Sequence, residues 1–356
     1  HDLVTIVGDN DRPVDDGTTT RDARGEWRPP IPVPICGAKA RIGKALKKVL
    51  GINGYLWPMP VLFAGLSFLV WMYFQPDSAA GFGGQGFNDL SGYQLRLDWI
   101  LLMYVRNVVM LSLWVGAWHL PLYALKRQGI RFKYNKRWMA TNSRGFLFGS
   151  QLWDNVFWSL VPGAGIWTVY EALLLWAYAE GWLVITTFRE SPVWFVAFFV
   201  VGSALWSPFH FYWIHRLIHW KPLYKAAHYL HHRNVNVGPW SSMSMHPLEQ
   251  VLYQTRWLIL FIVPSHPVHM FYLMIWVALG STGGHIGFHE MVVRKKGDVR
   301  MSVDSFFHYL HHRYFECNYG GGDIPYDRWF GTYHDGSPEA HARMRGRIPV
   351  SYTHLR

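Results

Sequence analysis

Residues 55–74, YLWPMPVLFAGLSFLVWMYF, form a run of 20 residues without a single charged side chain. A helix of about 20 apolar residues is long enough to cross the hydrocarbon core of a bilayer, which is about 30 Å thick. This stretch therefore predicts a membrane-spanning helix, and it restricts the rest of the chain to folds that a membrane protein can adopt.

Three further apolar runs follow, at about 99–125, 152–183 and 193–214. The first contains Arg106, and the second contains Glu171 and the helix-disfavouring sequence PGAG. An unpaired charge is costly inside a bilayer, so these two side chains are expected to face each other or water. Together with residues 55–74, the runs predict about four transmembrane helices.

A last apolar stretch, 251–280, is divided by PSHP at 264–267. Each half is too short to span, which favours a hairpin that dips into one leaflet and returns. The predicted fold class is therefore all-α and integral to the membrane: about four transmembrane helices and a membrane-dipping hairpin, with a helical cap outside the bilayer.

Composition supports a membrane protein over an ordinary soluble enzyme, since half of the residues are apolar, 17% are aromatic and only 16% are charged. The net charge of +11 could indicate nucleic acid, but the basic residues lie between the apolar runs, notably at 38–48 and 126–144. Basic loops of this kind favour the cytosolic side. We therefore expect no nucleic-acid partner, and we place the amino terminus and the histidine motifs in the cytosol.

Histidine is the residue type that indicates chemistry. The sequence HYLHH occurs at 228–232 and again, letter for letter, at 308–312. Each copy places histidines at i, i+3 and i+4, the spacing that gathers side chains on one face of a helix. Two His-x-x-x-His pairs precede the copies, in HRLIH and in HIGFHE. The ten candidate ligands are His215, His219, His228, His231, His232, His285, His289, His308, His311 and His312.

Ten imidazoles exceed the needs of one ion, because a structural zinc takes four ligands and a catalytic zinc about three plus water. Two metal ions that share the set are the economical interpretation. A single His-x-x-x-His pair occurs often without a metal, whereas four sets on one predicted side do not. His246 is a possible extra ligand, an outer hydrogen-bond donor or an ordinary loop residue, and His210 is a weaker candidate of the same kind. The two cysteines, Cys36 and Cys317, are too few for a cysteine-based metal site.

The ordered motifs HRLIH, HYLHH, MHPLE, HIGFHE and HYLHH, followed by NYGGGDIPYDRWFGT, resemble the fatty acid hydroxylase / sterol desaturase superfamily over about residues 195–335. One departure is His210, where members often have an acidic residue. The resemblance implies an O2-activating centre of two iron ions over a membrane base, a lipid substrate, and electrons from a separate donor. The donor would be of the cytochrome b5, ferredoxin or rubredoxin type, with its reductase, because no haem domain is visible in the sequence.

These observations predict a cytosolic N-terminal arm and amphipathic segment (1–50), a transmembrane region (51–192), a catalytic domain (193–335) and a C-terminal tail (336–356). The expected reaction removes hydrogen from an aliphatic C–H bond of a fatty acyl chain or sterol and yields an alcohol or an alkene. The location would be the bacterial cytoplasmic membrane or the endoplasmic reticulum. Two alternatives remain open, namely a membrane zinc hydrolase and a divalent-metal transporter. The absence of His-Glu-x-x-His disfavours the first, and ligands outside the spans disfavour the second.

Overall fold

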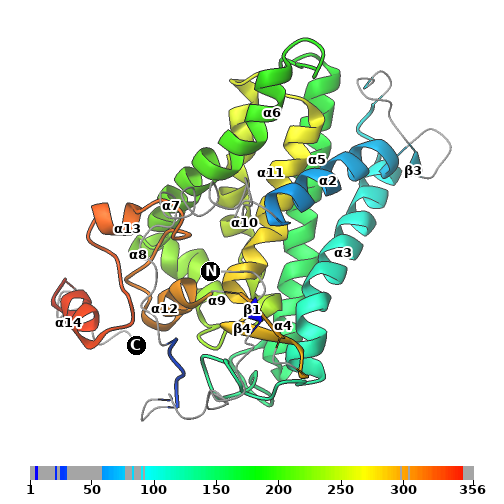
Figure 1. The fold of residues 1–356 in the computed structure, drawn as a ribbon. Helices are drawn as coiled ribbons and strands as arrows, with labels where there is room; N and C mark the ends of the chain where they lie inside the picture. The colour runs from blue at the N-terminus through cyan, green and yellow to red at the C-terminus, as the bar shows by residue number, and fades with distance from the viewer. Residues whose placement is uncertain are drawn as a thin grey trace.

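The computed structural model describes residues 5–6, 21, 25–29, 58–76, 82–83, 90, 93–296, 299–303 and 305–347. This part of the chain is mostly helical, and its long helices run alongside one another in a bundle (Figure 1). Most of the predicted N-terminal segment (1–50) and the end of the predicted tail (336–356) lie outside the described residues, so those domain boundaries stay predictions.

Three helical segments are long and apolar enough to cross a membrane: Leu97–Ala124, Gln151–Ala179 and Pro192–Ile218. Large apolar side chains on them point outward, with Leu97, Leu113 and Val193 each more than 70% exposed. Exposed apolar surface on this scale is typical of helices that face lipid. The predicted span 55–74 begins outside the described residues. Of its described part, residues 58–74, the 16-residue helix α2 (Pro58–Tyr73) covers all but the last residue.

Each long segment contains a π-helical turn within two residues of a proline: Pro121, Pro162 or Pro208. Proline removes one backbone donor and crowds the preceding turn, and a local π-helical adjustment relieves both problems without ending the helix. The PGAG sequence therefore does not break its helix as its composition suggests. The segments consist of α3 (Leu97–His119) and η1 (Leu120–Ala124); α4 (Gln151–Trp158), η3 (Ser159–Gly163) and α5 (Ala164–Ala179); and α6 (Pro192–Val201), η4 (Gly202–Trp206) and α7 (Ser207–Ile218).

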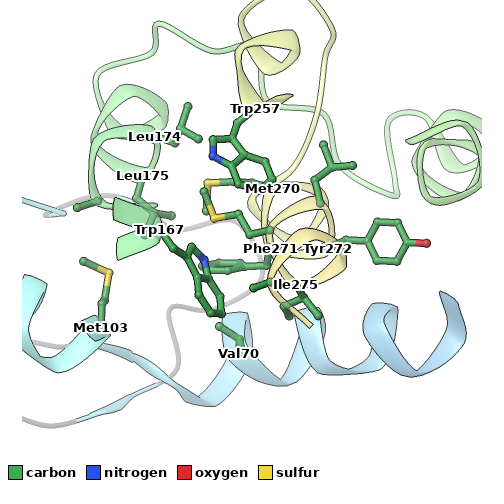
Figure 2. Close-up of a cluster of buried hydrophobic side chains, with 14 of the residues drawn as sticks. Val70, Met103, Trp167, Leu174, Leu175, Trp257, Met270, Phe271, Tyr272 and Ile275 are labelled. Carbon is green, nitrogen blue, oxygen red and sulfur yellow. The ribbon is translucent and has the colours of Figure 1, made fainter. Parts of the chain in front are cut away.

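Helix α11 (Pro267–Ala278) is the centre of the bundle. Its residues 270–275 are fully or almost fully buried, which marks a helix that is apolar on all sides and surrounded by others. Figure 2 shows Val70 of α2 and Trp167 of α5 close to Phe271, and Met103 of α3 belongs to the same buried cluster. The apolar core therefore lies between the predicted spans and the predicted hairpin.

The two charges inside the spans do meet. Arg106 of α3 donates to Glu171 of α5, and Asn107 donates to the other carboxylate oxygen at 3.0 Å. Both charged side chains are buried. The pair satisfies groups that would otherwise be stranded among apolar side chains, as expected from the sequence.

The 251–280 stretch folds as a hairpin of α10 (Pro247–Gln254) and η7 (Thr255–Phe261) followed by α11. Its turn pairs with the α5–α6 connection, because Ser265 donates to the Val184 carbonyl at 2.9 Å and Thr186 donates to the Ser265 carbonyl at 3.1 Å. The hairpin therefore reaches the end of the long helices where α5 connects to α6, and it returns to the end where the histidine motifs lie.

Small sheets modify the predicted all-α class. Strands β4 (Glu290–Arg294) and β5 (Val299–Ser302) form an antiparallel pair, which β1 (Thr5–Ile6) extends. A second pair consists of β2 (Gln75–Pro76) and β3 (Phe82–Gly83). The first sheet lies at the same end of the bundle as the histidine helices (Figure 1).

Short elements fill that end. They are η2 (Leu147–Gly149), α8 (Lys221–Leu223), η5 (Tyr224–His228), α9 (Tyr229–His232), η6 (Pro239–Ser242), η8 (Gly280–His285), α12 (Phe306–Tyr314), α13 (Tyr326–Trp329) and α14 (Pro338–Arg347). The basic segment 126–144 lies there too. Lys133 of this segment is buried and donates to the carbonyls of Asn135 and Arg137, and burial lowers its pKa to about 7. This lysine therefore has a structural role, beyond the topological one expected from the sequence.

Candidate metal centre

The first histidine pair lies at the end of a long helix. His215 occupies the last turn of α7, and His219 follows directly after the helix ends at Ile218. The i, i+4 spacing keeps both rings on one side, with their centroids 5.1 Å apart. The end of the molecule that carries the candidate metal ligands therefore begins where the apolar helical segment ends.

The two HYLHH copies divide their histidines in a reciprocal way. Residues i and i+4 of a helix lie almost in line, whereas i+3 is offset to the other side. In the first copy His228 and His232 face one position and His231 faces another. In the second copy His308 and His312 face the position that receives His231, and His311 faces the first position. This crossing explains why the same pentapeptide occurs twice.

Nine histidines consequently form two adjacent groups. Within each group the candidate ligand nitrogens all lie within 4.8 Å of one another. The groups touch, since the rings of His232 and His312 are 4.8 Å apart. The five-histidine group comprises His215, His219, His228, His232 and His311, and the four-histidine group comprises His231, His285, His308 and His312.

In several of these histidines, hydrogen bonds determine which ring nitrogen carries the proton and which presents a lone pair. Nδ1 of His231 contacts the Ser244 carbonyl at 3.2 Å, and Nδ1 of His285 contacts the Ser281 carbonyl at 2.9 Å. A carbonyl only accepts, so Nδ1 carries the proton in both rings and Nε2 presents a lone pair. These two Nε2 atoms nevertheless face each other at 3.2 Å. Two lone pairs at this distance repel, and a cation between them would remove the conflict.

The same arrangement recurs in the five-histidine group. Nδ1 of His215 and of His311 donates to the carbonyls of Tyr319 and Cys317, each at 2.6 Å. The Nε2 atoms that face one another in the two groups are 3.0–3.3 Å apart. Nitrogens bound at about 2.0–2.1 Å to one ion lie about 2.9–3.4 Å apart in octahedral or tetrahedral geometry. The residues present therefore fit two metal ions.

Burial keeps these imidazoles neutral. It holds the pKa of several of them well below the ordinary value of 6.5, with further lowering from neighbouring imidazoles, and it lowers the pKa of His231 to about 3 and of His285 to about 4. Neutral imidazole is the form that binds metal, so the rings are ready for a cation at neutral pH. The histidines whose pKa is held well below 6.5 are His219, His228, His232, His308, His311 and His312.

Glu249 contributes the one carboxylate that contacts these groups within the described residues. Its Oε1 lies 2.8 Å from Nδ1 of His228, and both side chains are fully buried. Burial raises the pKa of Glu249 well above its ordinary value of 4.5, and a cation on His228 would favour the charged form. A carboxylate behind a ligating histidine fixes the ring and makes it more basic.

The sequence did not single out Glu249 or Asp327. Glu249 belongs to the quoted MHPLE motif, and its place in the first turn of α10 could have indicated a buried role. Asp327 of α13 accepts from the backbone N–H groups of Tyr319 and Gly320 at 2.8 Å, and so fixes the loop whose carbonyl holds His215. Nothing local to Asp327 reveals that distant contact.

Three predicted residues lie outside both groups, namely His246, His210 and His289. His246 caps the start of α10, where its Nδ1 accepts from the Leu248 N–H at 3.2 Å. Nε2 of His210 lies 2.9 Å from the hydroxyl of Thr255. Neither of these two rings is brought to either group.

His289, the tenth predicted ligand, lies outside both histidine groups. The 3₁₀ helix η8 ends at His285, Gly287 has a φ of +77°, and the chain then enters β4. The i, i+4 spacing places two side chains on one face only where the helix continues through both. His289 instead lies beside Trp27 and Tyr134, and its Nδ1 is 3.3 Å from the Tyr134 hydroxyl.

Comparison with known proteins agrees with this geometry. The family model described as fatty acid hydroxylase matches residues 199–332, which contain every member of both groups. This segment belongs to the fatty acid hydroxylase family. No solved structure matches the chain significantly.

The curated relatives that this chain matches are named as sterol-modifying enzymes. Two Delta(7)-sterol 5(6)-desaturases of Gibberella zeae are 32% and 27% identical over 161 and 167 residues, covering 45% and 46% of this chain and 44% and 46% of theirs. Human lathosterol oxidase is 28% identical over 155 residues, which cover 43% of this chain and 49% of its own. The chain thus matches less than half the length of these relatives.

Proposed function

We propose that the protein is a membrane-bound oxygenase that uses O2 and external electrons to hydroxylate or desaturate an aliphatic C–H bond of a lipid. The observation that carries this proposal is the pair of touching histidine groups, whose Nε2 lone pairs face one another in a buried space. Nine neutral nitrogen ligands around two positions suit a redox-active metal pair better than one hydrolytic zinc, which needs about three ligands and water.

Iron is the metal we propose for both positions, although zinc could replace it during purification. When bound, the two ions would supply the activation of O2 and the removal of hydrogen from the substrate. His215, His219, His228, His232 and His311 would hold one ion, and His231, His285, His308 and His312 the other. The protein residues fix the tautomers through backbone carbonyls and exclude water by burial, which protects reactive species from side reactions.

A lipid substrate is supported by the position of the groups. His219 directly follows the apolar segment that ends at Ile218, so the centre would lie at the membrane boundary. An aliphatic chain or ring system could reach it from the leaflet while its polar head stays at the interface. Sterols are the first class to test, because the named relatives act on them, and fatty acyl lipids are the second.

Activity and partners can be tested together. The chain should be expressed in a lipid-defined host and purified without O2, and iron, O2 consumption and oxidised lipid should be measured after a reductant and lipid are added. We expect about two iron ions per chain and an alcohol or alkene product that requires O2. Product formation without O2 would favour a hydrolase, and metal uptake into vesicles without any product would favour a transporter.

Orientation is a separate part of the proposal. The basic segment 126–144 and the histidine groups lie at one end of the bundle, which supports a cytosolic centre because basic loops favour that side. Electrons would then arrive from a separate cytosolic carrier of the cytochrome b5, ferredoxin or rubredoxin type. Cysteine probes near 235 and near 320 should react from the cytosolic side only, and opposite accessibility of the two would contradict a shared centre.

A further inference from the structure

His289 belongs to a histidine motif but joins neither histidine group, and its surroundings indicate a different role. Its ring lies 5.4 Å from the ring of Trp27, and its Nδ1 lies 3.3 Å from the hydroxyl of Tyr134. Tyr134 and Trp27 are buried, whereas His289 is partly exposed. A phenol paired with an imidazole base is the arrangement that lets a tyrosine lose an electron and a proton together.

The same tyrosine connects to the candidate metal centre. The ring of Tyr134 stacks on the ring of Tyr309, with centroids 4.9 Å apart and planes inclined by 27°. Tyr309 belongs to α12, where it follows His308 directly and precedes His312 by three residues. Trp27 is the fourth ring of this row of His289, Trp27, Tyr134 and Tyr309, and its ring centroid lies 6.1 Å from that of Tyr134. Four rings thus run from a partly exposed imidazole to the helix that carries three candidate ligands.

We propose that Tyr134 and His289 form a proton-coupled redox pair that is linked to the metal centre through Tyr309. The pair gives one electron to the centre when O2 has oxidised it in the absence of lipid. This inference rests on the proposed function. Phenols and indoles lose an electron only to strong oxidants, so the resting centre would leave the row untouched. A centre oxidised by O2 that could attack an unactivated C–H bond would also be strong enough to oxidise a phenol.

The step is balanced within the row. One electron leaves the Tyr134 phenol and passes through Tyr309 to the oxidised centre, while the phenolic proton moves along the hydrogen bond to Nδ1 of His289. The products are a neutral tyrosyl radical, a protonated imidazole and a centre reduced by one electron. A soluble one-electron reductant of the thiol or ascorbate class then returns the electron, and His289 returns the proton. Without that reductant, Trp27 gives one electron to the tyrosyl radical and His289 returns the proton to the phenol. The indole left with one electron fewer loses its N–H proton to solvent, and the resulting radical combines with O2, which supplies the oxygen found on Trp27.

The experiment uses the full chain loaded with iron and purified without added lipid. The protein is reduced with dithionite in the absence of O2 and then mixed with O2. Samples are frozen for electron paramagnetic resonance and digested for peptide mass spectrometry. We expect the wild type to form a tyrosyl radical and to gain oxygen at Trp27, while the peptides that carry 228–232 and 308–312 stay intact.

Substitutions separate the pair from general effects. Tyr134→Phe should lose the radical and accumulate oxygen on the two histidine peptides, with iron content unchanged. His289→Gln retains a hydrogen-bond acceptor but no base, so its radical yield should fall as well. Tyr123→Phe is the matched control, because Tyr123 is also buried close to the centre but donates to the carbonyls of Val237 and Ile286. It should behave as the wild type does.

Two failures are distinguishable. A wild-type protein that binds no iron or consumes no O2 contradicts the proposed function and the redox pair together. Normal iron content and O2 consumption, with the same radical yield and the same damage in wild type and Tyr134→Phe, overturn the redox pair alone.

Discussion

The five-histidine group and the four-histidine group are built from the same parts but end with different ligand sets. Each receives histidines from both HYLHH copies, two from one copy and one from the other. The first His-x-x-x-His pair adds both members to the five-histidine group, whereas the second adds only His285 to the four-histidine group. A single interruption of helical structure after His285 thus makes two similar sites unequal.

The surroundings of the groups differ as well. His228 of the five-histidine group contacts the Glu249 carboxylate, while His231 and His285 of the four-histidine group contact only backbone carbonyls through Nδ1. A negative charge behind a ligand favours the more oxidised metal, and a smaller ligand set leaves room for an external ligand. We therefore expect the five-histidine group to hold its metal more firmly and the four-histidine group to be the more open site.

Removal of one histidine ligand should have the largest effect on activity and should show the clearest difference in metal content between the two groups. His228→Ala and His308→Ala should both abolish oxidation while the protein remains in the membrane, because each disturbs one ion and leaves the spans untouched. Their metal contents should differ. His308→Ala leaves three histidines and should retain about one ion per chain, whereas His228→Ala leaves four and should retain nearly two. Elemental analysis checks this, and equal loss from both variants would contradict the inequality.

Removal of the negative charge at Glu249 should weaken metal binding by the five-histidine group only. Glu249→Gln keeps the size of the side chain but removes the carboxylate behind His228, and such changes typically reduce metal affinity by about 10–100-fold. Competition with a chelator should show one ion released more easily and the other unchanged. Glu180→Gln, at an exposed glutamate after α5, is the control. Weakening of both ions alike would argue against a specific role for Glu249.

Substitution of Gly287 tests whether the turn after His285 is the reason that the two groups differ in their number of histidines. A Cβ there would lie 2.3 Å from the Tyr123 hydroxyl and 2.7 Å from the Val237 carbonyl, at a φ of +77°. Gly287→Ala should therefore destabilise the fold by about 1–3 kcal/mol and lower metal retention at the four-histidine group. Gly283→Ala is the matched control, since no atom lies within 4 Å of its added Cβ. Thermal unfolding with and without metal measures both effects, and equal behaviour of the two variants would refute the argument.

The sequence predicted the features that depend on local pattern. Apolar length indicated the spans, and i, i+3, i+4 spacing indicated that each HYLHH copy gathers its rings. The crossing of ligands between copies was not predicted, because it depends on how α9 and α12 face each other. The strands after His289 were also missed, since a positive φ at Gly287 is not visible in spacing alone. Glu249 and Asp327 act on histidines that are distant in sequence, and only packing reveals such contacts.

Substitution of His289 should give the smallest effect on metal content and the sharpest test of the inequality. If ten histidines served as ligands, the two groups would hold five each, and His289→Gln would lower metal content as His308→Ala does. The structure instead places His289 beside Trp27 and Tyr134, outside both groups. We therefore expect His289→Gln to retain about two ions per chain, with chelator release from both groups at the wild-type rate. Loss of one ion in this variant would show that the second pair closes like the first when metal binds, and the two groups would then be equal.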